Sequence, residues 1–424
     1  TFMVADMTSF YLAFSVASLS AYGLVSFETT ARAKRAGDVY MALALLGEAF
    51  ILLAFVILAM GVPVGNPLIR EAVAALPSSP LLAPALILLV LGFGLKMGLV
   101  PLHVWMPLAH PVAPMPASAA LSGIIVKAGV IGLIRFLPLE TELPGWGAGL
   151  VALGLFGAFY AVAVGITQRQ VKTVLAYSTI SQMGVVAAVL GAGMAAGAPG
   201  TALLAGFYAL HHLLVKGALF LGVGVVAESG QRRRWPLFLA MGVLALSLAG
   251  LPLTSGALAK YATRPLFGDD LAATLATLSA AGSTLLMLHF LRLLRQMPAA
   301  DPDAAPEAGI WLSWAVVAVA SLVLPWMLFQ PVTGYALADL FAAKALWTAV
   351  WPILLGSVLA LGLFRIGTAL PQVPEGDVIV LAERLMPLVR ATGLGIERAD
   401  RWLRQWPVAS AMLVALAISF AWMI

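Results

Sequence analysis

Four lysines stand inside long apolar stretches of this 424-residue chain, and their chemistry needs an explanation. They are Lys96, Lys127, Lys216 and Lys260. A charged side chain at the centre of a membrane helix costs about 2.5 to 3.5 kcal/mol on insertion scales, so four of them indicate a function. A buried lysine can gain and lose a proton near neutral pH, which suits it to proton transfer. The alternative is a lysine that snorkels to the membrane surface, and it is strongest for Lys260, near the end of its stretch.

Two histidines and a tyrosine accompany one of these lysines. Tyr208, His212 and Lys216 are spaced by four residues, so they project from one face of a helix. His211 lies beside them. Imidazole titrates near neutral pH, and a file of such groups can pass protons through bridging water. Metal binding is the alternative for His211 and His212, but adjacent residues point about 100° apart on a helix and no third ligand is apparent.

Helix breakers flank two of the lysines. Lys96 precedes Pro101 by five residues within a glycine-rich run, and Lys260 follows a Gly-Leu-Pro sequence at 250–252. Many transporters build an ion site at the middle of the membrane from discontinuous helices that carry a charge at the break. Apolar helices are generally rich in Gly and Pro, so the combination of a break with a lysine is what indicates such a site.

The elements that position these residues are predicted from composition. Hydrophobic residues make up 62% of the chain and charged residues 10%, and the mean hydropathy is +1.01. Soluble domains are about half apolar and about a quarter charged, so the composition predicts an all-α polytopic membrane protein. Runs of about 20 apolar residues predict about twelve transmembrane helices, at 8–26, 39–62, 82–106, 116–137, 147–167, 173–195, 201–227, 236–260, 271–295, 309–330, 346–366 and 407–424.

The loop charges predict the orientation in the membrane. Sixteen of the 24 lysines and arginines fall in alternate loops, and four fall in the loops between them. Cytoplasmic loops carry the excess of such residues, so the richer set is predicted to be cytoplasmic. The net charge of +5 is thereby explained by topology, and nucleic acid is not an expected partner. The richer loops hold Arg32, Lys34, Arg35, Arg169, Lys172, Arg232, Arg233, Arg234, Arg292, Arg295, Arg365, Arg384, Arg390, Arg398, Arg401 and Arg404; the poorer ones hold Arg70, Arg135, Arg264 and Lys344.

The segment 374–406 interleaves charged with apolar residues, unlike the rest of the chain. This pattern predicts an amphipathic helix along the cytoplasmic interface, and the alternative is a solvated linker with helical tendency. Cysteine is absent, which excludes disulfides, thiolate metal sites and iron–sulfur ligation. No nucleotide, flavin, quinone or metal motif is legible, so no cofactor is expected and any redox chemistry would belong to partner subunits.

Four motifs carry a resemblance to a known family. The most specific stretch is residues 96–135, KMGLVPLHVWMPLAHPVAPMPASAALSGIIVKAGVIGLIR. The others are VKTVLAYSTISQMG at 171–184, HHLLVKGALFLGVG at 211–224 and GLPLTSGALAK at 250–260. Together they resemble the antiporter-like, proton-translocating subunits of respiratory complex I, membrane-bound hydrogenases, formate hydrogenlyase and Mrp-type cation/proton antiporters. The hydrogenase-type branch is the most similar, and the resemblance extends from about residue 1 to 330.

The resemblance implies a pair of inverted five-helix repeats, each with a broken helix, at 1–137 and 147–295. Further spans at 309–366, the amphipathic helix at 374–406 and a final span at 407–424 would follow. By position, Lys96 resembles the proton-carrying lysine of the first broken helix and Lys127 the bridging lysine after it. His212 and Lys216 match the connecting group of the second repeat, and Lys260 matches the terminal residue of the second broken helix.

Two departures from the family pattern stand out. Ser15 occupies the place of a glutamate that gates the first lysine in the family. Glu48, the only carboxylate deep in a predicted span, lies on the neighbouring helix and could substitute for it, although a structural pairing elsewhere is the alternative. About four helices that normally precede residue 6 have no counterpart, so the first repeat is expected to be N-terminally incomplete, with an incomplete sequence favoured over a shortened protein.

The function expected from these features is proton or cation translocation by a multi-pass subunit of a larger complex, in a bacterial or archaeal inner membrane. Partners would be other membrane subunits, with a redox or carbon-uptake module as driver. The alternatives are an Mrp-type cation/proton antiporter subunit, an ion-coupled energising subunit of an inorganic carbon uptake complex, and a non-conducting scaffold. The proton-carrying residues would be Lys96, Lys127, His212, Lys216 and Lys260, with Glu48, His211, Tyr208 and Ser15 as accessory groups.

Overall fold

The computed structural model describes residues 4–62, 68–298, 301, 303–366, 370–408, 410–412 and 414. These residues form helices and no β-strand, which confirms the predicted all-α fold. Among them, nine helices are long and apolar enough to cross a membrane. They are α1 (Met7–Val25), α2 (Ala31–Met60), the α6–α7 stretch (Met115–Phe136), α8 (Pro144–Gly165), α9 (Val171–Ala196), α10 (Thr201–Glu228), α13 (Leu271–Gln296), α14 (Ala308–Thr333) and α15 (Ala343–Ile366).

The remaining predicted spans have two outcomes. The spans at 82–106 and 236–260 are broken helices, α4 (Leu82–Met97) with α5 (Trp105–Val112), and α11 (Arg234–Ala249) with α12 (Ser255–Thr263). The last predicted span, 407–424, falls largely outside the described residues, so the count of twelve is not confirmed. Short elements complete the chain: α3 (Ile69–Ala75), η1 (Leu76–Ser78), η3 (Gln231–Arg233), η4 (Arg264–Phe267) and η5 (Leu337–Phe341).

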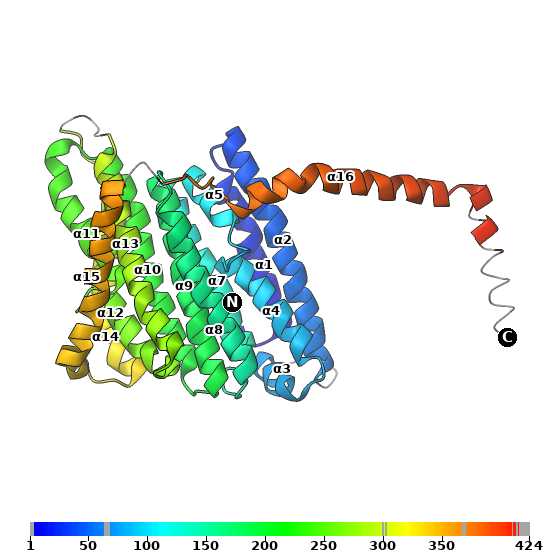
Figure 1. Cartoon of the computed structure of the whole chain (residues 1–424), viewed down its shortest axis with the longest axis horizontal. Coiled ribbons are helices and arrows are strands. Elements are labelled where there is room, and N and C mark those ends of the chain that lie inside the picture. The colour runs from blue at the N-terminus through cyan, green and yellow to red at the C-terminus, as the bar shows by residue number, and fades with distance from the viewer. Residues whose placement is uncertain are drawn as a thin grey trace. The chain divides into compact units, whose positions relative to one another are not determined.

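The helices from α1 to α15 belong to one compact unit, residues 1–375. Figure 1 shows their axes running side by side, so loops and short helices form both ends of this bundle. The apolar window of α9 is completely buried, which makes α9 a central helix. Glycines let α8 approach it closely, because a Cβ on Gly154 would lie 2.4 Å from the carbonyl oxygen of Gly184 and the reverse distance is equal. Small residues at such contacts are typical of membrane helix packing.

A second unit, residues 376–424, contains α16 (Val378–Leu403). The helix falls within the segment predicted to be amphipathic, so the predicted helix is present there. Its predicted place along the membrane interface stays a prediction.

The two broken helices have the same backbone construction. Both α4 and α11 are 16 residues long and end at a glycine with positive φ, 83° at Gly98 and 103° at Gly250. In each, the residue after the glycine donates its backbone N–H to the carbonyl five residues earlier, at 2.8 and 2.9 Å. This closing turn satisfies the last carbonyls of a helix and favours glycine, which has no Cβ to clash. The structure therefore contains the two predicted broken helices.

A third irregularity separates α6 (Met115–Ala120) from α7 (Val126–Phe136). Residues Leu121–Ile125 form a π-helical turn, η2. Such turns disturb the regular backbone pattern and are frequent at functional sites. Here the carbonyl of Ser122 accepts a hydrogen bond from the side chain of Lys127 at 2.9 Å. The π turn therefore provides a backbone acceptor for the Lys127 amine.

Contacts at one end of the bundle agree with the predicted orientation. Glu375 forms an ion pair with Arg32 and accepts a hydrogen bond from the hydroxyl of Thr173 at 3.1 Å. Arg234 donates to the carbonyls of Met297 and Pro298 at 2.8 and 2.6 Å. These contacts join segments that the charge pattern assigns to one side of the membrane. Which side faces the cytoplasm stays a prediction.

Candidate functional site

All the predicted site residues lie in the 1–375 unit. Lys96, Lys127, His212 and Lys216 are at most 4% exposed, and Lys260 is partly buried. They form two groups. The first cluster surrounds Lys96. The second cluster lies along one face of α10 and contains Lys127, His212, Lys216 and Lys260.

In the first cluster, Tyr40 of α2 holds Lys96 in the last turn of α4. The Lys96 Nζ donates to the Tyr40 hydroxyl at 2.7 Å and lies 4.7 Å from the centre of its ring. The Tyr40 hydroxyl donates in turn to the carbonyl of Ser18 at 2.6 Å. Trp105 packs edge-on against the Tyr40 ring and donates its indole N–H to the carbonyl of Leu95 at 2.9 Å. These contacts order the end of α4 around its lysine.

Ser15 and Glu48, singled out because the family glutamate is missing, meet in the same cluster. The Ser15 hydroxyl donates to the Glu48 carboxylate across the α1–α2 contact. Glu48 is 5% exposed, and its second carboxylate oxygen has no partner among the described residues. Its charge acts electrostatically on both Lys96 and Tyr40. The structure therefore brings the serine, the carboxylate, the phenol and the lysine together.

In the second cluster, Lys127 connects α7 to α10. Its Nζ lies 2.5 Å from Nδ1 of His212. The hydroxyl of Ser122, in the π turn, lies 2.8 Å from the hydroxyl of Thr179 on α9. Lys127 and Ser122 belong to the first predicted repeat, whereas His212 and Thr179 belong to the second. Side-chain contacts therefore cross the predicted boundary between the repeats at two points.

Lys216 follows His212 by one turn of α10. Its Nζ donates to the carbonyl of Leu175 at 2.6 Å and to the hydroxyl of Ser178 at 2.5 Å, both on α9. Lys127 and Lys216 both act electrostatically on His212. The second cluster thus places three ionisable groups within mutual reach.

Tyr208 precedes His212 by one turn and brings Lys260 to the same face of α10. The Lys260 Nζ lies 3.4 Å from the Tyr208 hydroxyl. That hydroxyl donates to Oε1 of Gln182 at 2.8 Å, and the Gln182 amide donates to the Ser283 hydroxyl at 2.8 Å. The predicted common face of Tyr208, His212 and Lys216 is therefore present, with Lys260 at its end.

His211 faces other neighbours. Its Nδ1 lies 2.9 Å from the hydroxyl of Ser255, which lies 3.0 Å from the hydroxyl of Ser247. These serines flank the break between α11 and α12. His211 and His212 therefore contact different elements, and His211 is a neighbour of the second break rather than a member of the second cluster.

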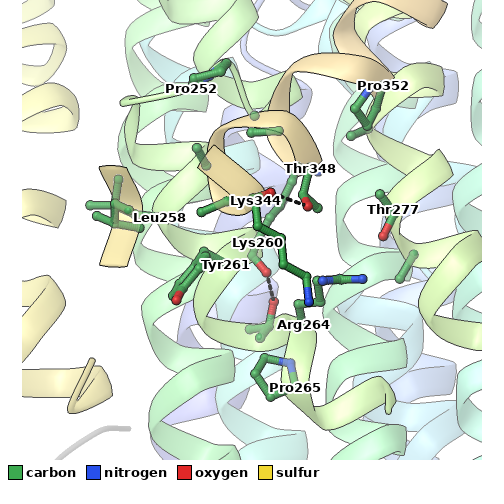
Figure 2. Close-up of a pocket in the computed structure, with 18 of the residues that line it drawn as sticks. Pro252, Leu258, Lys260, Tyr261, Arg264, Pro265, Thr277, Lys344, Thr348 and Pro352 are labelled. Carbon is green, nitrogen blue, oxygen red and sulfur yellow. Dashed lines mark hydrogen bonds between the residues drawn. The ribbon is translucent and has the colours of Figure 1, made fainter. Parts of the chain in front are cut away.

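A cavity of about 450 Å³ lies beside Lys260, and we call it the Lys260 cavity. Residues of α12, η4, the start of α13, η5 and the start of α15 line it. Figure 2 shows Lys260 and Arg264 one turn apart on its wall, with Lys344 and Thr348 contributed by α15. Arg264 and Lys344 belong to the loops predicted to be non-cytoplasmic. On that orientation, the cavity extends from Lys260 toward the non-cytoplasmic side.

Several polar partners were not predicted from the sequence. Ser178, Thr179 and Gln182 stand in a motif used for the family resemblance, yet no role was expected for them. Tyr40 lies eight residues before Glu48, so the two side chains project about 80° apart on α2, with Ala44 between them. These partners could have been found by searching the apolar spans for polar side chains at helical spacing from an ionisable residue.

Comparison with known proteins shows the family of this chain and several similar proteins. The model described as NADH:quinone oxidoreductase/Mrp antiporter, TM, matches residues 5–289, which include every predicted site residue. Hydrogenase-4 component B of Escherichia coli (strain K12) is 36% identical over 229 residues, which cover 51% of this chain and 34% of that protein. The Na(+)/H(+) antiporter subunit A1 of Staphylococcus haemolyticus is 30% identical over 361 residues, covering 75% and 44%. NADH-quinone oxidoreductase subunit N of Desulforudis audaxviator is 33% identical over 279 residues, covering 60% and 53%.

The fold also matches a solved structure. The structure of the Mrp complex from Dietzia sp. DQ12-45-1b superimposes with a TM-score of 0.80 at 24% identity, covering 100% of this chain and 50% of that chain. This likeness shows a shared fold. The matches cover from 31% to 65% of the length of the first curated relatives.

Proposed function

Because the chain belongs to the NADH:quinone oxidoreductase/Mrp antiporter family of transmembrane subunits, we propose that it moves protons along a file of buried ionisable side chains. The file consists of Lys96, Lys127, His212, Lys216 and Lys260. The observation that carries the proposal is the 2.5 Å contact between Nζ of Lys127 and Nδ1 of His212. This contact links the lysine of one predicted repeat to the histidine of the other.

Coupling along the file arises from like charges at short range. Lys127, His212 and Lys216 are buried together, and two positive charges close to one another cannot both persist in a medium of low dielectric. A proton that arrives at one group therefore drives a proton off the next. The serine, threonine and tyrosine hydroxyls beside the lysines provide hydrogen-bonding positions along the way.

Glu48 takes the part of the missing family glutamate at the first cluster. Its buried carboxylate, held by Ser15, supplies a negative charge near Lys96. The Tyr40 hydroxyl, bonded to the lysine amine, lies on the same helix as the carboxylate. An opposite charge stabilises the protonated lysine, so loss or movement of the carboxylate would release the proton toward Lys127.

The Lys260 cavity is the outlet of the file. Lys260 faces this cavity of about 450 Å³, whose wall also holds Arg264 and Asp269, and water there would receive a proton from the amine. On the predicted orientation this outlet leads to the non-cytoplasmic side. The ion is the proton, because amines and imidazoles are proton carriers whereas hard metal cations prefer oxygen ligands.

Transport in this direction needs a driver. Moving one charge against 100 mV costs about 2.3 kcal/mol, so other membrane subunits and a redox or ion-gradient module would supply the energy. The relatives include named components of hydrogenase and quinone oxidoreductase assemblies, which supports a place in a multisubunit complex of a bacterial or archaeal inner membrane. A cation/proton antiporter complex is the second candidate, supported by the antiporter subunit that matches 75% of the chain.

Proton flux into vesicles tests this function. The full chain, with the subunits that co-purify with it, is reconstituted around a pH-sensitive dye, and a pH gradient is imposed. Lys96→Ala and Lys260→Ala should each reduce flux on the order of a hundredfold, the contribution typical of a positioned proton carrier. Lys34→Ala, at an exposed lysine in the first turn of α2, is the control and should behave as wild type. Equal flux in all four samples would leave the non-conducting scaffold as the better account.

A further inference from the structure

His110 is a buried imidazole outside the proposed file. It lies near the end of α5, the second half of the first broken helix, and none of its surface is exposed. Neither ring nitrogen has a hydrogen-bond partner among the described residues. Buried polar groups are almost always paired with protein or ordered water, so two unpaired nitrogens on one ring require an explanation.

The neighbours of His110 connect it to the second cluster. Its ring stacks on Phe220, with 4.7 Å between ring centres and 20° between planes. The Nζ of Lys216 lies 5.5 Å from the centre of the same Phe220 ring. The charges that act on His110 are those of Lys216, Lys172 and Lys127. His110 therefore lies within electrostatic reach of both the buried file and the end of the bundle where Lys172 begins α9.

A second cavity, of about 350 Å³, is lined by residues adjacent to His110 and to its stacking partner, Phe220. Its wall includes Pro111, the next residue in the chain, and Val223, which follows Phe220 by one turn on the same face of α10. Lys172 also lines it and donates to the carbonyl of Ala113, at the end of α5, at 2.5 Å. The wall of this cavity is therefore next to His110 in the chain, although the imidazole itself does not line it.

The two cavities lie at opposite ends of the bundle, as α13 demonstrates. Ala276, Thr277 and Ala280, near the start of α13, line the Lys260 cavity. Leu293 and Gln296, in its last turn, line the second cavity. Arg169 and Lys172 on the second cavity come from the loops predicted to be cytoplasmic, so we call it the cytoplasmic cavity.

We propose that His110 relays protons from the cytoplasmic cavity to Lys216, which gives the chain a proton inlet between its two predicted repeats. The inference rests on the proposed function and adds a residue and a route to it. Water in the cavity, in contact with the Lys172 amine, explains how an imidazole without a protein partner is supplied with a proton.

The relay uses both ring nitrogens. One nitrogen accepts a proton from hydronium in the cavity, which leaves water, and the ring becomes a cation. The N–H on the other nitrogen then passes its proton, through a bridging water beside Phe220, to the neutral amine of Lys216. The imidazole is left neutral in the opposite tautomer, and rotation or a second exchange with water resets it. One proton enters and one arrives at Lys216, with no other change in bonding.

Flux in reconstituted vesicles tests the inlet. His110→Phe keeps an aromatic ring stacked on Phe220 but cannot carry a proton, and it should lower flux at least tenfold. His110→Ala should lower flux similarly, and free imidazole added on the side of the cytoplasmic cavity should restore much of it. His289→Gln is the matched control: His289 is a buried histidine bonded to the carbonyl of Gln168, and glutamine retains a donor for that carbonyl.

The outcomes separate the inlet from the function on which it depends. Flux at the wild-type level in His110→Phe would overturn the inlet, as would a loss in His110→Ala that imidazole fails to restore. If those results accompany the expected losses in Lys96→Ala and Lys260→Ala, only the inlet is wrong. If Lys96→Ala and Lys260→Ala also conduct normally, the proposed function itself fails.

Discussion

The two broken helices are alike in backbone and different in what surrounds their lysines. α4 and α11 each end at a left-handed glycine, Gly98 and Gly250. Lys96 lies before its break, is 3% exposed and is bonded to Tyr40. Lys260 lies after its break, on α12, and faces a cavity of about 450 Å³.

Helix ends do not explain this difference. Both lysines stand in the last turn of their half-helix, where the backbone dipole favours a positive charge. The difference lies in the packing around them, since α2 closes over Lys96 with a phenol and a carboxylate, whereas the short helices η4 and η5 leave space beside Lys260. The same backbone break therefore has two different surroundings. We call the enclosed surroundings of Lys96 the closed end and the cavity beside Lys260 the open end. Release of a proton at the closed end requires a neighbouring residue that controls it.

Labelling of introduced cysteines gives the largest expected contrast. The chain has no cysteine, so each single-cysteine variant reports one position without background. Thr348→Cys, on the Lys260 cavity, should react with a membrane-impermeant maleimide from the non-cytoplasmic side. Ala44→Cys, buried between Tyr40 and Glu48 on α2, should remain unlabelled from either side. Labelling of both at similar rates would remove the distinction between the open and the closed end.

Removal of the Glu48 charge should lower proton flux through its effect on Lys96, at the closed end. Glu48→Gln should lower proton flux on the order of a hundredfold, because it removes the negative charge that acts on Lys96. Ser15→Ala should have a smaller effect, since it removes one hydrogen bond to the carboxylate and leaves the charge. The control is Glu71→Gln, an exposed carboxylate in α3. Wild-type flux in Glu48→Gln would show that the carboxylate is structural.

The two tyrosines should differ in importance. Tyr40→Phe should lower flux about tenfold, because a hydrogen bond to a charged group contributes about 1.5 to 3 kcal/mol. Tyr208→Phe should have a smaller effect through Lys260, whose Nζ lies 3.4 Å from the hydroxyl compared with 2.7 Å at Tyr40. Flux measurements on both variants under one gradient check this order. A larger loss of flux in Tyr208→Phe than in Tyr40→Phe would contradict the conclusion that Lys96 has the tighter contact with its tyrosine.

Alanine at the two break glycines gives the smallest expected effects. Both positions have positive φ, so each substitution should destabilise the fold by about 1 to 2 kcal/mol in thermal unfolding. The added Cβ at Gly250 would lie 2.9 Å from Cδ and Cε of Lys260, whereas at Gly98 it would meet the end of the Met106 side chain. Only Gly250→Ala should therefore also reduce flux. Equal flux in the two variants would show that Lys260 tolerates displacement.

The charged residues of the site were predictable from the sequence. Lys96, Lys127, Lys216 and Lys260 stand out in any reading of the sequence because a charge in an apolar span is costly. The spacing of four residues placed Tyr208, His212 and Lys216 on one face of α10, as the structure shows. Local rules of helix geometry are sufficient for such conclusions.

The remaining features depend on packing between helices distant in the sequence. The bond from Lys96 to Tyr40 depends on the rotation of α2 against α4, and no local pattern determines that rotation. The π turn that offers the Ser122 carbonyl to Lys127 contains Gly123, but glycine is common in apolar spans and does not predict such a turn. The Lys260 cavity depends on how η5 and α15 pack beside α12. The sequence likewise gives no signal for His110, because only the structure stacks it on Phe220, whose ring Lys216 also faces.

The most direct test of the central claim is a double-mutant cycle across the contact between the two repeats. Proton flux is measured for wild type, Lys127→Met, His212→Phe and the double variant, with protein assembly checked in each. If protons pass from one residue to the other, each single variant interrupts the same step, and the double variant should conduct about as little as either single one. Losses that multiply independently, or singles that conduct as wild type, would contradict a file running through Lys127 and His212.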